Sequence, residues 1–208
     1  MRSNGGGEEQ RGRCFVKRGI VLYTVGMSQD DLMDVVDNQD TVTGGVSRRQ
    51  IHHDGLRHRE VHVWLFTNKG EIVFQHRSKT ADTYPDLLDA SCGGHVDLGE
   101  DYLTAAKREL QEETGIEARD DELVLLGKAK TDSFDSVTKK HNNTFRQVYS
   151  YRLADGQSVI RDPKETSEFE YISFEKLSQF NEDEKKRFIP WMLSPFMVKV
   201  YKRIEQMV

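Results

Sequence analysis

The sequence contains little cysteine and no long apolar run. Only two cysteines, Cys14 and Cys92, occur in 208 residues, and Cys14 falls in a charged, Gly-rich segment. A disulfide framework is therefore not expected, and a reducing compartment is the default. No apolar stretch approaches the roughly 20 residues of a membrane-spanning helix, and no signal peptide is evident. We therefore expect a cytoplasmic protein that does not act at a membrane.

The chain also lacks an excess of positive charge. Its formal net charge is −5, so it has no general electrostatic attraction to nucleic acid or to anionic lipid. We expect a small-molecule substrate and no nucleic-acid partner. An anionic substrate would need local cations or a metal ion to hold it. The sequence leaves open a monomer or a homodimer.

Residues 1–26 differ from the rest of the chain. MRSNGGGEEQRGR is rich in glycine and charge, which predicts a disordered extension, and FVKRGIVLYTVG could form one short strand. Met27 is our candidate for the natural start. Residues 27–208 are expected to form a single domain.

That domain has the pattern of an α/β fold. Residues 61–77, VHVWLFTNKGEIVFQHR, predict a hairpin that turns at Asn68 and Gly70. The first strand is apolar at odd and even positions, as in a sheet covered by helices on both faces. A helix over residues 101–114 should end at Gly115. Further elements are expected as strands in 122–130, 144–153 and 169–174 and as a closing helix in 194–207.

The helix over residues 101–114 carries crowded acidic residues. Its core-facing arc consists of Leu103, Ala106 and Leu110. At about 100° per residue, Glu109, Glu112 and Glu113 fall directly beside this arc. A solvated charge run should lie opposite the apolar face, and crowded carboxylates stay ionised together when a cation neutralises them. Hard oxygen ligands favour Mg²⁺ or Mn²⁺, which bind substrate phosphates.

The residues around these acids make a spaced motif. Gly94 is followed after five residues by Glu100 and after seven more by residues 108–116, RELQEETGI. This motif resembles the Nudix box at every defined position. By average residue usage, a chance match is on the order of one in a billion per window. The resemblance implies a Nudix-type α/β/α sandwich with a mixed sheet and a loop–helix–loop catalytic motif.

The resemblance also implies roles for particular residues. Metal ligands would be the carbonyl of Gly93 and the carboxylates of Glu109, Glu112 and Glu113, and the ion Mg²⁺ or Mn²⁺. Glu109 and Glu112 would be catalytic, with Glu112 as the preferred general base. The structural positions of the motif would be Gly94, Glu100, Arg108 and Gly115.

Other candidates lie outside the motif. Glu165 and Glu168, in ETSEFEYISF, are alternatives to Glu112 as the base, although ordinary loop charges are the more frequent outcome. Arg77 and Lys79, in QHRSK, are candidates for binding a substrate phosphate.

Several further stretches resemble the isopentenyl diphosphate isomerase branch of the Nudix superfamily. These are LDASCGGHVDLGE, HVWLFTNKG, HRSK and PWMLSPFMV. Such isomerases use a cysteine beside the box glycine, a glutamate on a later strand, and a metal held by histidines and acids. Here Cys92 lies one residue too early, and Phe145 and Gln147 stand where the isomerase acids would fall. The intact box therefore favours a hydrolase on an isomerase-like frame.

The histidines leave one question open. His52, His58 and His95 lie near the positions of the isomerase metal histidines, so a structural or vestigial metal site is an alternative. In the polar segment HHDGLRHRE, exposed or hydrogen-bonded histidines are the commoner outcome.

We expect a metal-dependent hydrolase that cleaves a diphosphate linkage in a nucleoside diphosphate derivative or a related organic diphosphate. The alternatives are an isopentenyl diphosphate isomerase and a non-catalytic, diphosphate-binding Nudix module.

Overall fold

The computed structural model describes residues 13–17, 20–24, 32–81, 83–136 and 140–208. Most of the expected N-terminal extension, residues 1–26, lies outside these ranges. Where the sequence suggests one short strand, the structure has two, β1 (Arg13–Lys17) and β2 (Ile20–Thr24), which pair antiparallel. The disorder of the extension and a start at Met27 remain predictions.

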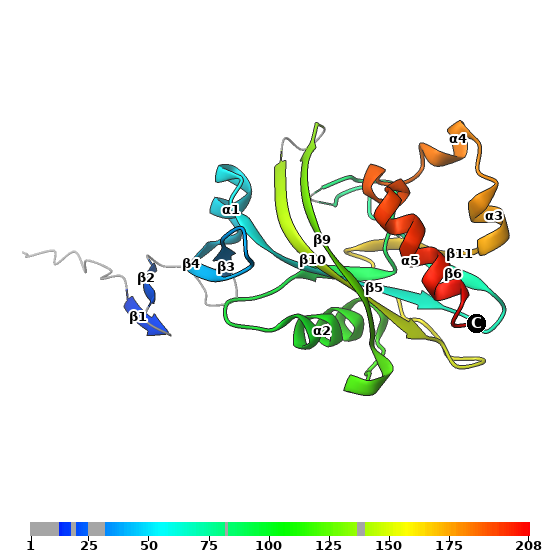
Figure 1. Ribbon diagram of the computed structural model, residues 1–208, viewed down its shortest axis with the longest axis horizontal. Coiled ribbons are helices and arrows are strands. Elements are labelled where there is room, and N and C mark those ends of the chain that lie inside the picture. The colour runs from blue at the N-terminus through cyan, green and yellow to red at the C-terminus, as the bar shows by residue number, and fades with distance from the viewer. Residues whose placement is uncertain (1–12, 18–19, 25–31, 82, 137–139) are drawn as a thin grey trace, which may run out of the picture.

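A mixed sheet forms the centre of the molecule (Figure 1). Its strand order is β11-β6-β5-β10-β9, and only the central pair, β5 with β10, runs parallel. Two short strands, β7 and β8, pair with β6 and β5. The strands are β5 (Arg57–Phe66), β6 (Glu71–Arg77), β7 (Leu88–Asp89), β8 (Cys92–His95), β9 (Val124–Asp135), β10 (Lys140–Arg152) and β11 (Thr166–Ser173).

The central strand β5 is buried on both faces, as its sequence predicts. Successive side chains of a strand point to opposite faces. Val61 and Val63 belong to one apolar cluster, with Ala106 and Leu110 of the acidic helix. Trp64 lies in a second cluster with residues of the C-terminal helix. Both clusters consist of buried residues, so β5 contributes side chains to two hydrophobic cores, one on each face of the sheet.

One helix covers each face of the sheet (Figure 1). Helix α2 (Tyr102–Thr114) begins after the N-cap Asp101 and ends at Gly115, whose φ of 71° is the left-handed conformation that glycine adopts without strain. Helix α5 (Pro195–Glu205) covers the other face and starts with proline after the N-cap Ser194. The expected α/β/α sandwich with a mixed sheet is confirmed.

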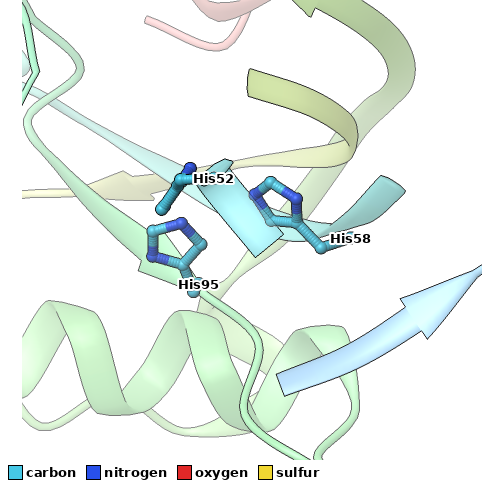
Figure 2. A group of neighbouring side chains, drawn as sticks. All are labelled: His52, His58 and His95. Carbon is cyan, nitrogen blue, oxygen red and sulfur yellow. The ribbon is translucent and has the colours of Figure 1, made fainter. Parts of the chain in front are cut away.

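An N-terminal layer lies at one end of the sheet (Figure 1). The hairpin of β3 (Leu32–Val36) and β4 (Val42–Ser47) leads into α1 (Arg48–Asp54), which the Ser47 side chain caps. This layer brings His52 of α1 against His58 and His95 (Figure 2). The sequence analysis assigned no element to residues 42–54.

The remaining helices are short. They are η2 (Asp120–Glu122), α3 (Phe174–Ser178), α4 (Glu182–Lys185) and η3 (Pro190–Leu193). Within the described ranges, none of the helices has the length and apolar character to cross a membrane.

Candidate active site

Helix α2 buries two of its three clustered glutamates. Glu113 is 6% exposed, and the Glu109 side chain is 12% exposed. The Glu112 side chain is 58% exposed. The expectation that all three acids lie at the rim of the core is therefore right for Glu109 and Glu113, whereas Glu112 faces solvent. Its position one residue before Glu113 turns it about 100° around the helix.

Arg108 connects these acids to the loop before α2. Its Nη1 donates to Glu109 Oε1 at 2.7 Å and to Glu112 Oε2 at 3.2 Å. Its Nε and Nη2 donate to the two oxygens of Glu100 at 3.2 and 3.0 Å, and Nη2 also donates to the carbonyl of His95 at 2.9 Å. One guanidinium thus fixes the loop on the helix and supplies the positive charge between Glu109 and Glu112.

Two adjacent glycines let β8 approach these carboxylates closely. A Cβ atom on Gly94 would lie 2.2 Å from Glu109 Oε1, and a Cβ atom on Gly93 would lie 2.4 Å from the Val61 carbonyl oxygen. The backbone N–H of Gly93 donates to Glu113 Oε1 at 3.4 Å. Any larger residue here would displace a carboxylate or the sheet.

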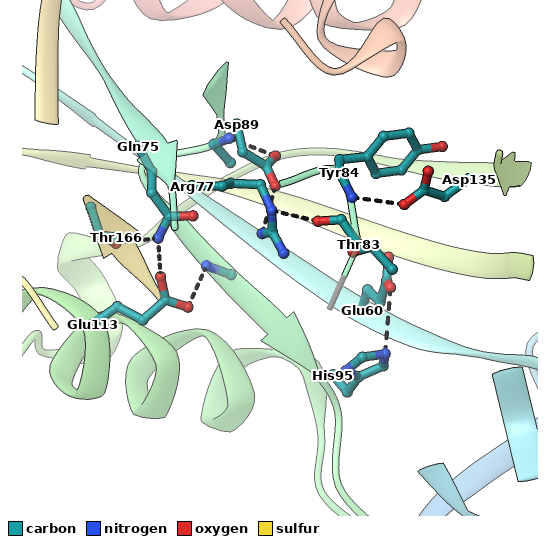
Figure 3. A network of polar contacts seen from close by, with 12 residues as sticks. Glu60, Gln75, Arg77, Thr83, Tyr84, Asp89, His95, Glu113, Asp135 and Thr166 are labelled. Carbon is teal, nitrogen blue, oxygen red and sulfur yellow. Dashed lines mark hydrogen bonds and ion pairs between the residues drawn. The ribbon is translucent and has the colours of Figure 1, made fainter. Parts of the chain in front are cut away.

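Gln75 holds the other side of Glu113, as Figure 3 shows. Its buried amide nitrogen donates to Glu113 Oε2 at 2.5 Å and to Thr166 Oγ1 at 2.6 Å. The sequence analysis missed Gln75. A polar side chain within the apolar run IVFQ of a buried strand was the available signal, because such a group needs a hydrogen-bond partner.

The two buried carboxylates hold protons more tightly than free ones. Burial, together with the charges of Glu112 and Asp97, raises the pKa of Glu109 to about 7, and Arg108 opposes this shift. Burial and the charge of Glu109 raise the pKa of Glu113 well above its usual range. Both carboxylates would ionise more easily beside a cation.

The box residues fit a hard divalent cation by their chemistry. Carboxylate oxygens and a backbone carbonyl are the ligands that Mg²⁺ and Mn²⁺ prefer. In the described part of the chain, however, the oxygens of Glu109, Glu112 and Glu113 are not gathered within 4.8 Å of one another. Arg108 Nη1 bonds to Glu109 and Glu112 instead. A cation that binds all three would have to take over these contacts.

A cavity of about 380 Å³ adjoins the box at Gly93 and Gly94. Its wall carries basic side chains from four segments, namely Arg48, Arg77, Arg146 and Lys164. Trp191 also lines it, and the Arg146 guanidinium lies over the Trp191 ring, 4.2 Å from its centroid. This cavity is large enough for part of a substrate and suits a negatively charged one.

The two expected phosphate-binding residues have different surroundings. Arg77 lines the cavity, but its guanidinium donates to Asp89 at 3.1 Å and to the Thr83 carbonyl at 2.9 Å (Figure 3). Lys79 is exposed and does not line this cavity. Arg77 is therefore the better placed of the two to contact a substrate, and phosphate binding by either residue stays a prediction.

The three candidate bases are also separated. Glu165 lines the cavity together with Gly93 and Gly94, and its charge acts on Glu113. Glu112 faces solvent beside Arg108. Glu168 is 64% exposed and pairs with His76 at 3.3 Å. Of these three glutamates, only Glu165 is among the described residues that line the cavity.

The residues that an isomerase would need are poorly placed. Cys92 is 1% exposed, and burial, with the charges of Glu113 and Glu109, raises the pKa of its thiol well above the usual value. On β10, the amide oxygen of Gln147 accepts a hydrogen bond from Tyr149 at 2.6 Å. A neutral, buried thiol and an amide are weak acid–base groups.

The histidines of HHDGLRHRE do not share one environment. His53 is exposed, as expected. His52 and His58 are only 9% and 0% exposed, and a ring nitrogen of each contacts a backbone carbonyl, that of His141 at 3.4 Å and that of Leu56 at 3.0 Å. Of the two expected outcomes, exposed or hydrogen-bonded, the second therefore holds for these two. Helix α1 packs against β10, and the His52 ring packs on the His58 ring. No pattern local to the segment encodes these contacts.

Comparisons with known proteins show the family to which this chain is similar. Residues 56–192, more than half of the chain, match the family model described as NUDIX domain. An uncharacterized Nudix hydrolase of Clostridium acetobutylicum is 29% identical over 156 residues, which cover 73% of this chain and 74% of that protein. Nudix hydrolase 3 of Arabidopsis thaliana is 28% identical over 182 residues, 85% of this chain but only 24% of that protein.

A solved structure shows the same fold. The DR0079 protein of Deinococcus radiodurans superposes with a TM-score of 0.62 at 24% identity, over 83% of this chain and 98% of that one. The arrangement of sheet and helices is therefore that of a Nudix domain.

The close approach of Gly94 to Glu109 gives a first prediction. Gly94→Ala should push the Glu109 carboxylate aside, because the added Cβ would lie 2.2 Å from Oε1. We expect Mg²⁺ affinity, measured by calorimetry, to fall about tenfold or more, with an unchanged circular dichroism spectrum. Gly44→Ala is the control, because its Cβ would meet nothing within 4 Å and its backbone is not in the left-handed region. Unchanged Mg²⁺ affinity in Gly94→Ala would contradict the placement of Glu109.

The raised pKa of Glu109 gives a second prediction, for protein stripped of metal. Between its usual value of 4.5 and about 7, the folded state binds more protons than the unfolded state, so this group destabilises the fold as pH rises. Relative to Glu109→Gln, the free energy of unfolding of the wild type should fall by up to about 3 kcal/mol over this interval.

The difference between the two proteins is the quantity to measure. Burial lowers the pKa values of His62 and His95, which act with the opposite sign in part of the same interval. Urea unfolding at a series of pH values gives this difference, and Mg²⁺ at pH 7 should abolish it. A constant difference that Mg²⁺ does not change would show that Glu109 is ionised normally.

Proposed function

The chain belongs to the Nudix family, and we propose that it hydrolyses a diphosphate linkage of a small organic molecule with the help of Mg²⁺ or Mn²⁺. Family membership and relatives named as Nudix hydrolases indicate a pyrophosphohydrolase. The observation that carries the metal-dependent mechanism is the pair of buried carboxylates, Glu109 and Glu113. Burying two acids side by side is unfavourable unless a cation joins them.

The cation would be held by Glu109, Glu112, Glu113 and the carbonyl of Gly93. When bound, such an ion neutralises the charge of diphosphate oxygens and makes a water molecule more acidic. Glu112 is exposed and bonded to Arg108, so its carboxylate would have to turn toward such an ion. The single guanidinium contact of Glu112, at 3.2 Å, on an exposed side chain makes this movement inexpensive.

The chain's own residues prepare the site. Arg108 orients Glu100 and Glu109 and binds the carbonyl of His95 at the end of β8. Gln75 fixes one oxygen of Glu113 and leaves its other oxygen toward Gly93. These contacts hold the carboxylates in place before any ligand arrives.

The proton of the attacking water needs a carboxylate that is ionised and near the substrate. Glu112 remains our first choice, because it belongs to the box and is solvated. Glu165 is the alternative general base, since it lines the same cavity as Gly93. A base must come within hydrogen-bond reach of the water that it deprotonates.

The substrate class is a nucleoside diphosphate derivative or a related organic diphosphate. Arg48, Arg146 and Lys164 on the cavity wall favour a negatively charged ligand. Trp191 offers an aromatic surface, although Arg146 and His62 already contact its ring. We further propose a cytoplasmic protein, as a monomer or homodimer.

The two alternative functions make distinct demands. An isopentenyl diphosphate isomerase would need acid–base groups at carbon, and the buried Cys92 thiol is poorly suited to that role. A non-catalytic module would bind diphosphates without turnover. The buried pair Glu109 and Glu113 suits a metal-dependent hydrolase and favours it over both alternatives.

A turnover screen tests the proposed function. Protein with Mg²⁺ or Mn²⁺ is given nucleoside diphosphate derivatives, nucleoside di- and triphosphates and isopentenyl diphosphate, and the products are identified by mass. We expect cleavage of a diphosphate linkage, reduced about a hundredfold or more in Glu113→Gln and in Glu112→Gln. The control is Glu117→Gln, an exposed glutamate just after α2, which should keep full activity.

The same assay separates the candidate bases. A variant of the base should lose kcat while Mg²⁺ affinity stays unchanged, so Glu112→Gln and Glu165→Gln are compared in both measurements. Full activity in Glu113→Gln would refute the metal site. Absence of cleavage, with deuterium uptake into isopentenyl diphosphate, would favour the isomerase instead.

A further inference from the structure

Three histidines from distant parts of the chain converge beside the sheet (Figure 2). His52 comes from α1, His58 from β5 and His95 from β8. Their ring centroids are 5.1 to 5.4 Å apart, and one nitrogen of each lies within 4.8 Å of the others. Three imidazoles gathered this closely could all bind one ion.

Strand register brings a carboxylate to the same place. Glu60 of β5 lies opposite His95 of β8 and, on its other side, opposite Arg146 of β10. His58 precedes Glu60 by two residues on β5, so the two side chains project from the same face. The cluster is therefore a product of sheet pairing, completed by α1.

Two of the imidazoles have a nitrogen without a partner. His58 Nδ1 lies 3.0 Å from the carbonyl oxygen of Leu56. Because a carbonyl only accepts, Nδ1 carries the hydrogen, and Nε2 keeps a free lone pair. Among the described residues, buried Nε2 of His58 and of His95 make no hydrogen bond. A carbonyl on one nitrogen and an open second nitrogen is how metal-binding histidines are held.

Glu60 turns one oxygen toward these open nitrogens. Its Oε1 lies 3.7 Å from Nε2 of both His58 and His95, which is too far for a hydrogen bond. Its Oε2 accepts from Nε and Nη2 of Arg146 at 3.1 and 2.5 Å. The pair with Arg146 fixes the carboxylate, and a metal ion at about 2.0–2.2 Å from each ligand would bridge the gap.

We propose that His52, His58, His95 and Glu60 form a second metal site, which takes a divalent transition-metal ion such as Zn²⁺. Three imidazole nitrogens and one carboxylate oxygen suit zinc, whereas a site made only of oxygen ligands suits Mg²⁺ or Mn²⁺. The chain would thus hold two chemically different ions.

The second site faces the cavity next to the box. His52, Glu60 and His95 line the same wall as Gly93 and Gly94. A zinc ion with these four ligands could bind an oxygen of a substrate as a fifth ligand. Such a role in substrate binding rests on the proposed function, whereas metal binding itself does not.

Metal content tests the site without any substrate. The full chain is stripped with a chelator, supplied with Zn²⁺ in the presence of excess Mg²⁺, dialysed, and analysed by mass spectrometry of its metals. Titration with Co²⁺ adds a visible absorption band that reports imidazole ligands. We expect stoichiometric zinc, and a Co²⁺ affinity that falls about tenfold or more in His52→Gln.

Matched variants identify the ligands. His53→Gln, at the exposed neighbour on α1, should bind Co²⁺ like the wild type, and so should Glu109→Gln in the box. His58 is fully buried, so His58→Gln is interpreted only after its circular dichroism matches the wild type. His52 lies at the edge of the cluster and provides the safer variant.

Two results would overturn the second site. One is a wild type that retains no zinc and shows no Co²⁺ band. The other is a Co²⁺ affinity that falls in Glu109→Gln but not in His52→Gln. Zinc binding that survives when all diphosphates fail as substrates would instead support the site and refute only the proposed hydrolase.

Discussion

The burial of Glu109 and Glu113 is the constraint on which the rest of the site depends. Two carboxylates on the core side of one helix are costly to ionise in a poorly solvated space. Three neighbouring residues reduce this cost by donating hydrogen bonds or by leaving room, against the charges of Glu112 and Asp97, which increase it. Arg108 faces Glu109, Gln75 faces Glu113, and Gly94 has no side chain that would press on Glu109. A bound cation would further lower the cost of ionising the two carboxylates.

The central strand β5 links this site to the histidine cluster. Its odd-numbered residues, such as Val61, pack under α2, and its even-numbered residues, such as Glu60, project to the opposite face. Strand β8 runs beside it and carries Gly94 opposite Val61 and His95 opposite Glu60. Adjacent residues of two paired strands therefore contribute to the box and to the second metal site.

Local sequence patterns predicted several helices and strands, and they predicted the acidic helix that carries part of the site. Spacing identified α2 with its cap at Gly115, the hairpin of β5 and β6, and the double burial of β5. The turn of 100° per residue placed Glu109 and Glu113 beside the core, but it does not say how far a neighbouring loop covers the helix. That is why the exposure of Glu112 was not foreseen.

Contacts between distant segments could not be predicted from one sequence. Glu60 and Arg146 are far apart in the chain and meet through parallel pairing of β5 and β10. His58 lies in a polar segment, RHRE, whose composition suggests exposure, yet α1 covers it. Gln75 finds its partners only when β6, β11 and α2 are assembled. In each case the side chain is polar and the partner comes from tertiary structure.

Proton release on Mg²⁺ binding tests most directly whether buried, crowded carboxylates form the cation site. Calorimetry at pH 6 in two buffers with different ionisation enthalpies measures the protons released. If Glu109 and Glu113 are protonated in the metal-free protein, Mg²⁺ binding should release protons, and Glu109→Gln should release fewer. Equal binding heats in both buffers would mean that no protons leave, and would contradict a cation site built on these two acids.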